Sequence, residues 1–196
     1  MPDSPAAFLS LLDTVARLSA PGGYCSGTLI DPETVLTCSH FFRGRDTAQC
    51  RVAGQHRRVA RVRCIPGTDL ALVTLDRPVT GVDRFAELGP PPAPLTEVVT
   101  FGYGGGARTP AGRVGRFLTQ MPLAVSRGMR TVVKPAGLIY NSVPAVRGDS
   151  GGPVFADGRI VAVQSLILDP QGVNLRLATV ALVGPASSRW RPRRVE

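Results

Sequence analysis

Residues 148–153 read Gly-Asp-Ser-Gly-Gly-Pro, which places a single serine among three glycines. Glycine adopts backbone conformations that other residues avoid, so this turn can direct the N–H groups of Gly148 and Ser150 toward one point. Two such donors form an oxyanion hole, and each is worth about 3–4 kcal/mol of transition-state stabilisation. The alternative is a glycine-rich turn that contains a serine by chance. The stretch predicts a nucleophilic serine with its own oxyanion hole.

The chain has two histidines, His40 and His56, and both precede Ser150. The Gly-x-Ser-x-Gly pattern also matches the nucleophile elbow of α/β-hydrolases, but in that fold the histidine follows the serine. A histidine-activated serine must here use the order His–Asp–Ser or Asp–His–Ser. In the second order the serine usually stands in a Gly-Thr-Ser-x-Ala sequence, and the absence of that sequence here disfavours this order. His40 ends an apolar, β-branched run, whereas His56 is interpreted as a solvated loop residue.

Asp69 stands at the head of an apolar run, Leu-Ala-Leu-Val-Thr-Leu at residues 70–75. Apolar residues on both faces of such a run are typical of a buried strand. A carboxylate beside a buried strand is costly unless it is paired, and the Nδ1–H group of His40 would pair it. The alternative is that Asp69 caps the turn after Pro66 and Gly67. Ser150, His40 and Asp69 are therefore the candidate catalytic residues.

Three segments together resemble the chymotrypsin/trypsin-like serine proteases. Residues 25–30 and 35–40 resemble the strand–turn–strand that delivers the family's histidine. Residues 68–72, Thr-Asp-Leu-Ala-Leu, resemble its Asp-Ile-Ala-Leu-Leu segment, and residues 148–153 are its serine motif without change. Weaker matches at residues 99–104 and 160–165 extend the resemblance from about residue 22 to about residue 182.

The resemblance implies two six-stranded antiparallel β-barrels packed together, and a role for each site residue. Ser150 is the nucleophile, His40 is the general base and then the general acid, and Asp69 orients His40. The N–H groups of Gly148 and Ser150 bind the oxyanion. Ser165 is expected to support Asp69 and the substrate backbone.

The chain departs from the family at its start, because no Ile-Val-Gly-Gly-like terminus stands upstream of Cys25. In the family, that terminal ammonium pairs with the aspartate that corresponds to Asp149. Asp149 therefore needs another partner or stays unpaired until something binds, and an arginine side chain is the simplest candidate for a partner.

The cysteines depart from the family as well. The family's cysteine after the histidine is Phe41 here, so Cys25 lacks its usual partner. Four cysteines allow three pairings, and Cys38, Cys50 and Cys64 match no common family pair. No secretory signal is apparent in the first residues, which predicts a cytoplasmic protein with reduced thiols.

The resemblance places the pocket for the substrate side chain between two segments, around Pro144 and Ala145 and around Ser165, Leu166 and Ile167. Trypsin-type enzymes carry an aspartate where this chain has Pro144. An apolar pocket is therefore expected rather than one for arginine or lysine.

Composition independently favours an all-β barrel or sandwich. The chain has 22 glycines and 18 prolines in 196 residues, and these turn-formers separate short β-branched runs. The runs are residues 59–62, 98–101, 129–133 and 160–168. Only residues 4–18 have helical spacing of apolar residues, which predicts a short N-terminal helix packed on a barrel.

A proline-rich stretch at residues 89–94 marks the clearest boundary, because polyproline is stiff and does not enter a central strand. It predicts a helix and first barrel at 1–88 carrying His40 and Asp69, and a second barrel at 95–183 carrying Ser150. Residues 184–196 form a basic C-terminal tail.

The net charge of +9 is carried almost wholly by arginine. Such a charge could attract an acidic partner protein or nucleic acid, although charge runs are usually solvated and nucleic acid is disfavoured. No apolar run is long enough to cross a membrane. No metal or other cofactor is expected, because neither the cysteines nor the histidines have metal-ligand spacing.

These features predict a small bacterial serine endopeptidase that forms an acyl-enzyme. Its partner would be a protein or peptide substrate, and family analogy favours one dedicated intracellular protein. The alternative is a catalytically silent binding module on the same fold, although all three triad residues are present.

Overall fold

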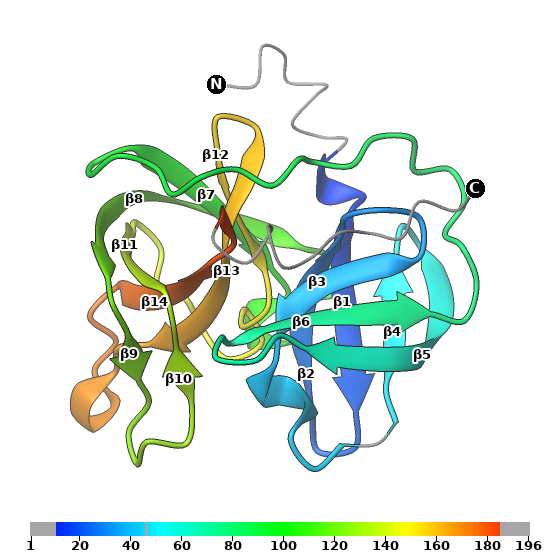
Figure 1. Ribbon diagram of the computed structural model, residues 1–196, viewed down its shortest axis with the longest axis horizontal. Coiled ribbons are helices and arrows are strands. Elements are labelled where there is room, and N and C mark those ends of the chain that lie inside the picture. Colours follow the sequence, from blue (N-terminus) through cyan, green and yellow to red (C-terminus); the bar gives the residue numbers. More distant parts are fainter. Residues whose placement is uncertain (1–10, 46, 185–196) are drawn as a thin grey trace.

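The computed structural model describes residues 11–45 and 47–184. Their regular structure is almost entirely β-strand, with three short 3₁₀ turns (Figure 1). The strands are β1 Val15–Ala20, β2 Gly23–Leu29, β3 Thr34–Cys38, β4 Gln49–Val52, β5 Gln55–Cys64, β6 Leu70–Leu75, β7 Glu97–Gly102, β8 Ala111–Met121, β9 Ala124–Val125, β10 Val132–Val133, β11 Ala136–Asn141, β12 Pro153–Ala156, β13 Arg159–Ile167 and β14 Leu177–Leu182. The 3₁₀ turns are η1 His40–Phe42, η2 Gly104–Gly106 and η3 Pro170–Gly172.

Twelve of these strands close into two six-stranded antiparallel barrels, in the orders β1-β2-β3-β6-β5-β4 and β11-β14-β13-β12-β7-β8. Closure removes the unpaired edges that strands otherwise expose. Strands β9 and β10 form a separate two-stranded hairpin. The expected all-β architecture of two packed barrels is confirmed.

The barrels share a hydrophobic core that fixes their relative position. Phe101 and Phe155 of the second barrel belong to the same buried cluster as Leu18 and Val35 of the first. The two phenylalanine rings meet edge to face, with centroids 5.8 Å apart, a favoured aromatic geometry. Because this core is continuous, the residues that each barrel brings to the interface are held in a defined relation.

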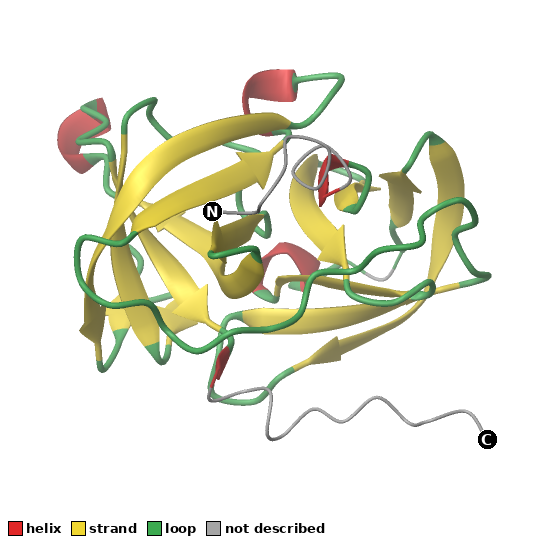
Figure 2. Cartoon of the chain, turned by 90° about the horizontal axis from the view of Figure 1, so that it is seen from above, coloured by secondary structure: helices red, strands yellow, loops and turns green. Residues whose placement is uncertain are grey.

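The connection between the barrels leaves β6 at Leu75 and enters β7 at Glu97. It crosses the molecule without a strand of its own, as Figure 2 shows. Leu88 forms an isolated bridge with Ile160, and the Gly89 N–H donates to the Ile160 carbonyl at 2.8 Å. The proline-rich stretch therefore begins where the chain docks on β13.

The predicted N-terminal helix is wrong for its last residues, because Val15–Ala20 is strand β1. Val15 and Leu18 are buried, and β1 pairs with both β2 and β4. The apolar spacing of these residues is compatible with a helix, but pairing with two neighbouring strands provides hydrogen-bond partners for their backbone groups and makes them a strand. Leu11 and Leu12 are helical, and residues 1–10 and 185–196, which include the start of the predicted helix and the basic tail, lie outside the described residues. Within the described residues no helix has the length and apolarity to cross a membrane.

Candidate active site

Strand β3 and the start of β6 bring His40 and Asp69 together in the first barrel. The two strands pair up to Cys38 and Leu70, and the Ser39 N–H donates to the Asp69 carbonyl at 3.0 Å. Strand pairing therefore ends one residue short of Asp69, and η1 begins at His40. This geometry leaves both side chains at the same end of the barrel.

Asp69 is completely buried and accepts four hydrogen bonds. His40 donates from Nδ1 to Oδ2 at 2.8 Å and from its backbone N–H to Oδ1 at 2.9 Å. The Ser39 hydroxyl donates to Oδ1 at 2.9 Å, and the Ser165 hydroxyl reaches Oδ2 from the second barrel. Burial raises the pKa of Asp69, but the hydrogen bonds and charge of His40 outweigh it and lower that pKa.

The imidazole of His40 is held on both nitrogens. Nδ1 faces Asp69, and Nε2 lies 3.7 Å from the Cys38 sulfur. Burial by itself would lower the pKa of His40, but the hydrogen bonds to Asp69 and Cys38 raise it to about 10. Burial raises the pKa of the Cys38 thiol well above 9.0.

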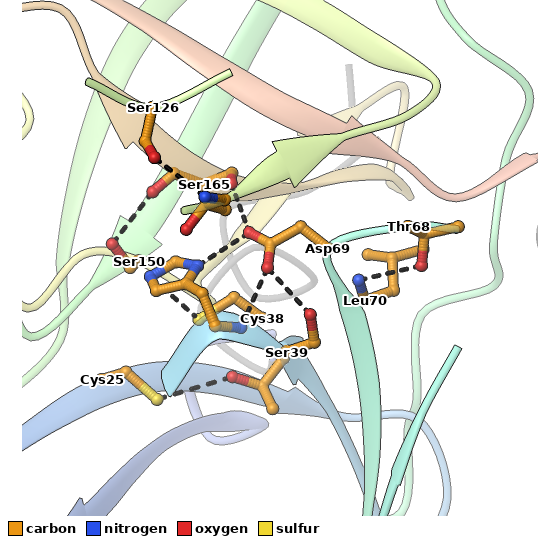
Figure 3. Close-up of polar contacts among 12 residues, drawn as sticks. Cys25, Cys38, Ser39, Thr68, Asp69, Leu70, Ser126, Ser150 and Ser165 are labelled. Atoms are coloured by element: carbon orange, nitrogen blue, oxygen red, sulfur yellow. Dashed lines mark hydrogen bonds and ion pairs between the residues drawn. The ribbon is translucent and has the colours of Figure 1, made fainter. Parts of the chain in front are cut away.

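Ser150 enters the same region from the second barrel, as Figure 3 shows for Ser150, Ser165, Cys38 and Asp69. Its hydroxyl donates to the Ser165 carbonyl at 3.1 Å. In the part of the chain that the structure describes, Ser150 and His40 share no hydrogen bond. The serine, the imidazole and the carboxylate are therefore gathered, with the serine hydroxyl turned toward β13.

The loop before Ser150 has a fixed peptide orientation. The Arg147 carbonyl accepts a hydrogen bond from the Gly105 N–H at 2.9 Å, so the N–H of the next residue, Gly148, points the opposite way across the trans peptide. Ser26 holds the loop from the first barrel, because its hydroxyl donates to the Gly148 carbonyl at 2.7 Å and its N–H to the Ser150 carbonyl at 2.8 Å. Neither the Gly148 nor the Ser150 N–H has an acceptor among the described residues.

Only glycine fits at position 148. Its φ is +102°, and a Cβ added there would lie 2.3 Å from the Tyr24 ring. Positive φ and the close aromatic ring both exclude a side chain. The glycine in the serine motif is thus required by backbone geometry as well as by contact.

Asp149 is the second completely buried carboxylate of the region, and it binds the side chain of Arg113. Arg113 Nη1 lies 3.0 Å from Oδ1, and the N–H groups of Gly104 and Val146 donate at 2.9 and 2.8 Å. Burial raises the pKa of Asp149, against the lowering effect of these bonds and of Arg113. The expectation of an internal arginine as partner is confirmed. Its identity was not evident because Arg113 lies 36 residues away in sequence, on β8.

The five predicted substrate-binding residues lie on the two segments that flank Ser150. Ala145 is buried and Pro144 is half-buried, and their carbonyls accept bonds from Asn174 and Arg113. Ser165, Leu166 and Ile167 end β13, where only Ser165 is buried. Sequence reasoning missed Gln164, a completely buried residue whose amide has no hydrogen-bond partner among the described residues.

The remaining candidates lie apart from this arrangement. His56 is exposed, but it lies within strand β5 opposite Arg51 and not in a loop. Over residues 55–60, half-buried and exposed positions alternate along β5, as expected for a strand with one face toward solvent. All four cysteines are free thiols. No group of histidine, cysteine and acidic residues within 11–45 and 47–184 could hold a metal ion.

The sequence is similar to those of known peptidases. The chain is 26% identical over 163 residues to an uncharacterized peptidase of Corynebacterium glutamicum, covering 80% of this chain and 58% of that protein. It is 25% identical over 178 residues to the snake venom serine protease HS112 of Bothrops jararaca, covering 77% and 70%. The chain thus spans less than two thirds of the Corynebacterium relative.

Solved structures share the fold. The active form of the Rv3671c protease of M. tuberculosis superimposes with a TM-score of 0.76 at 18% identity, covering 94% of this chain and 85% of that one. The MamO protease domain of Magnetospirillum magneticum gives 0.74 at 22% identity, covering 94% and 100%. The trypsin-like peptidase domain family matches residues 25–163, which is more than two thirds of the sequence. The chain therefore belongs to the trypsin-like peptidase family.

Proposed function

We propose that this protein is a serine endopeptidase that cleaves peptide bonds through Ser150, His40 and Asp69. The observation that carries the proposal is the His40–Asp69 hydrogen bond of 2.8 Å, with Ser150 brought to the same region from the other barrel. A carboxylate bonded to Nδ1 fixes the tautomer in which Nε2, the nitrogen beside the Cys38 sulfur, carries no proton and can accept one. This is the arrangement that activates a serine hydroxyl.

The reaction begins when the Ser150 hydroxyl turns from the Ser165 carbonyl toward Nε2 of His40. Catalytic hydrogen bonds are often absent before substrate binds and tighten in the complex. Ser150 Oγ forms a bond to the peptide carbonyl carbon as its proton passes to Nε2, and the electrons of the C=O π bond move onto the carbonyl oxygen, which becomes an oxyanion. The N–H groups of Gly148 and Ser150 stabilise that charge.

Collapse of this intermediate breaks the peptide C–N bond, and the proton on Nε2 passes to the leaving amine. The acyl-enzyme is then hydrolysed by a water molecule that gives its proton to His40. Asp69 stabilises the imidazolium in both halves of the reaction. Arg113 acts earlier, by neutralising Asp149 so that the loop can hold the Gly148 N–H toward the substrate.

The proposed substrate is an extended segment of a protein, bound along the end of β13. Pro144, Ala145, Leu166 and Ile167 are uncharged and flank the nucleophile. They favour an apolar side chain next to the cleaved bond. One dedicated intracellular protein is the proposed physiological substrate.

A fluorophosphonate probe tests the proposal, because it forms a covalent bond only with an activated serine. We expect the wild-type protein to be labelled at Ser150, and Ser150→Ala to remain unlabelled. Labelling should be unaffected by metal chelators. His40→Ala should also abolish labelling, and the double variant should be no worse, because the residues act as a unit.

The second candidate is a binding module that retains the triad without using it. The observation that favours it is the Ser150 hydroxyl, which donates to the Ser165 carbonyl and not to His40. A correctly folded wild-type protein that resists the probe at every pH would support this alternative.

A further inference from the structure

The β9–β10 hairpin stands apart from both barrels and is attached to the region of the candidate site. Figure 1 shows it extending away from the second barrel. Arg43, the residue after η1, donates from Nη1 to the Thr131 hydroxyl at 3.2 Å and also to the Arg130 carbonyl. The hairpin from the second barrel is thus linked by one side chain to the turn that begins with His40.

The two faces of this hairpin differ. On the inner face, Val133 is completely buried and Thr131 nearly so. On the outer face, Val125 and Val132 are opposite each other in the register, and both are exposed. The inner face anchors the hairpin, and the outer face is left exposed by the described residues.

Exposed apolar residues concentrate on this outer face and at its tip. Leu123 is 50% exposed, Val125 45%, Val132 44% and Met129 76%. Met129 also has a φ of +57°, which is uncommon for a long side chain. Residues in such sparsely populated backbone regions cluster at active sites and at segments that contact ligands. Large apolar groups gathered on one exposed ribbon mark an interaction surface.

The charge on the same ribbon has a single sign. Arg127, Arg130 and Lys134 are exposed beside the apolar residues. No aspartate or glutamate occurs between Glu97 and Asp149. The exposed Arg43 and Arg147 extend this positive field to both sides of the candidate site. A surface of this charge attracts acidic segments and repels basic ones.

We propose that the outer face of the β9–β10 hairpin is a docking surface for an acidic segment of the protein substrate that also carries apolar residues. The inference rests on the proposed peptidase function and specifies its substrate class. Acidic side chains of the segment pair with Arg127, Arg130 and Lys134, and its apolar side chains cover Met129 and its neighbours. Docking here holds the substrate beside Ser150 before its scissile bond engages the site.

The test measures binding without turnover, so it stands apart from the proposed catalysis. The protein is the Ser150→Ala variant of the full chain, and the probes are two short fluorescein-labelled peptides. One alternates glutamate and leucine, and the other has glutamine in place of glutamate. Fluorescence anisotropy should give a Kd about tenfold lower for the acidic peptide, and this preference should shrink as salt is added.

Two charge-reversal pairs locate the surface. Arg127→Glu with Arg130→Glu should remove the preference for the acidic peptide. Arg77→Glu with Arg84→Glu changes the net charge by the same amount. Both arginines are exposed and follow the C-terminal end of β6, whereas Asp69 precedes its N-terminal end. This control pair should leave both Kd values within about twofold. Met129→Ser should weaken both peptides by about fivefold, because it removes apolar contact and no charge.

Three results would overturn the proposal. These are equal affinity for the two peptides, an equal loss in the two charge-reversal pairs, or retained preference in a hairpin pair whose thermal melting is unchanged. A dimer in sedimentation velocity that Met129→Ser dissociates would assign the face to a second copy of the chain. Tight acidic binding in a protein that the fluorophosphonate does not label would refute the peptidase and leave the docking surface standing.

Discussion

Asp69 and Asp149 are both completely buried beside the candidate site, one in each barrel, and they are neutralised in different ways. Asp69 faces an imidazole, a group that gains and loses a proton near neutral or alkaline pH. Asp149 faces Arg113, which stays charged throughout. The first pairing can change its charge during a reaction cycle, whereas the second holds one arrangement of the backbone.

The pKa directions of the two carboxylates follow this difference. The pKa of Asp69 is lowered, because donors from His40 and Ser165 outweigh burial. The pKa of Asp149 is raised, because burial outweighs Arg113 and two backbone donors. Two equally buried carboxylates can therefore have different roles, because the groups that face them, and not the extent of burial, set their protonation behaviour.

The largest expected effect on activity is that of Asp69→Asn. The amide keeps the shape but holds His40 in the wrong tautomer, so kcat/KM should fall by about 10⁴-fold with little change in folding. Steady-state hydrolysis of a peptide ester and circular dichroism measure the two properties. If most activity survives, another acid orients His40.

Arg113→Gln probes the other carboxylate. Loss of the cation should release the Gly148 N–H and lower kcat by about 10²- to 10³-fold, the effect of losing one oxyanion donor. It should also cost about 3–5 kcal/mol in the free energy of unfolding, because Asp149 would be left buried without its cation. Urea denaturation measures this stability.

Arg116→Gln is the matched control for Arg113→Gln, because it is an exposed arginine on the same strand, β8. It should leave kcat unchanged and stability within about 0.5 kcal/mol. Equal effects of the two changes would show that Asp149 does not depend on Arg113.

The pH dependence of activity should distinguish the His40–Asp69 pair from the Arg113–Asp149 pair. His40 must be neutral to accept a proton, so kcat/KM should rise with pH through a midpoint above 6.5, toward the raised pKa of about 10. Below 6.5, and as long as Asp69 stays ionised, the His40–Asp69 pair contributes its full stability, which is lost as pH rises through the folded pKa of His40. Asp69→Asn should move the midpoint to lower pH, because burial then acts without the carboxylate.

The Arg113→Gln variant should keep the wild-type midpoint, whatever its residual rate. A midpoint that moves equally in both variants would mean that the two carboxylates are electrostatically coupled.

The smallest expected effect is that of His56→Ala. His56 is exposed on β5 and has no part in either carboxylate pair, so activity and midpoint should stay within about twofold of wild type. A large loss would show that the wrong histidine was assigned as the base.

The sequence alone determined the all-β class, the family and the order of His40, Asp69 and Ser150. Those conclusions rest on local patterns, each of which can be recognised within a few neighbouring residues. The patterns are glycines at a turn, an acid at the start of a strand and runs of β-branched residues. The residues predicted around the serine do gather in space, since strand pairing and the shared core bring their segments together.

The tertiary structure decided the rest. Val15–Ala20 became a strand because β2 and β4 lie on either side of it. Arg113 became the partner of Asp149, and Arg43 the link to the β9–β10 hairpin, through contacts between distant segments. Such pairings depend on which strands close each barrel and how the barrels pack, and no local pattern of residues encodes that geometry.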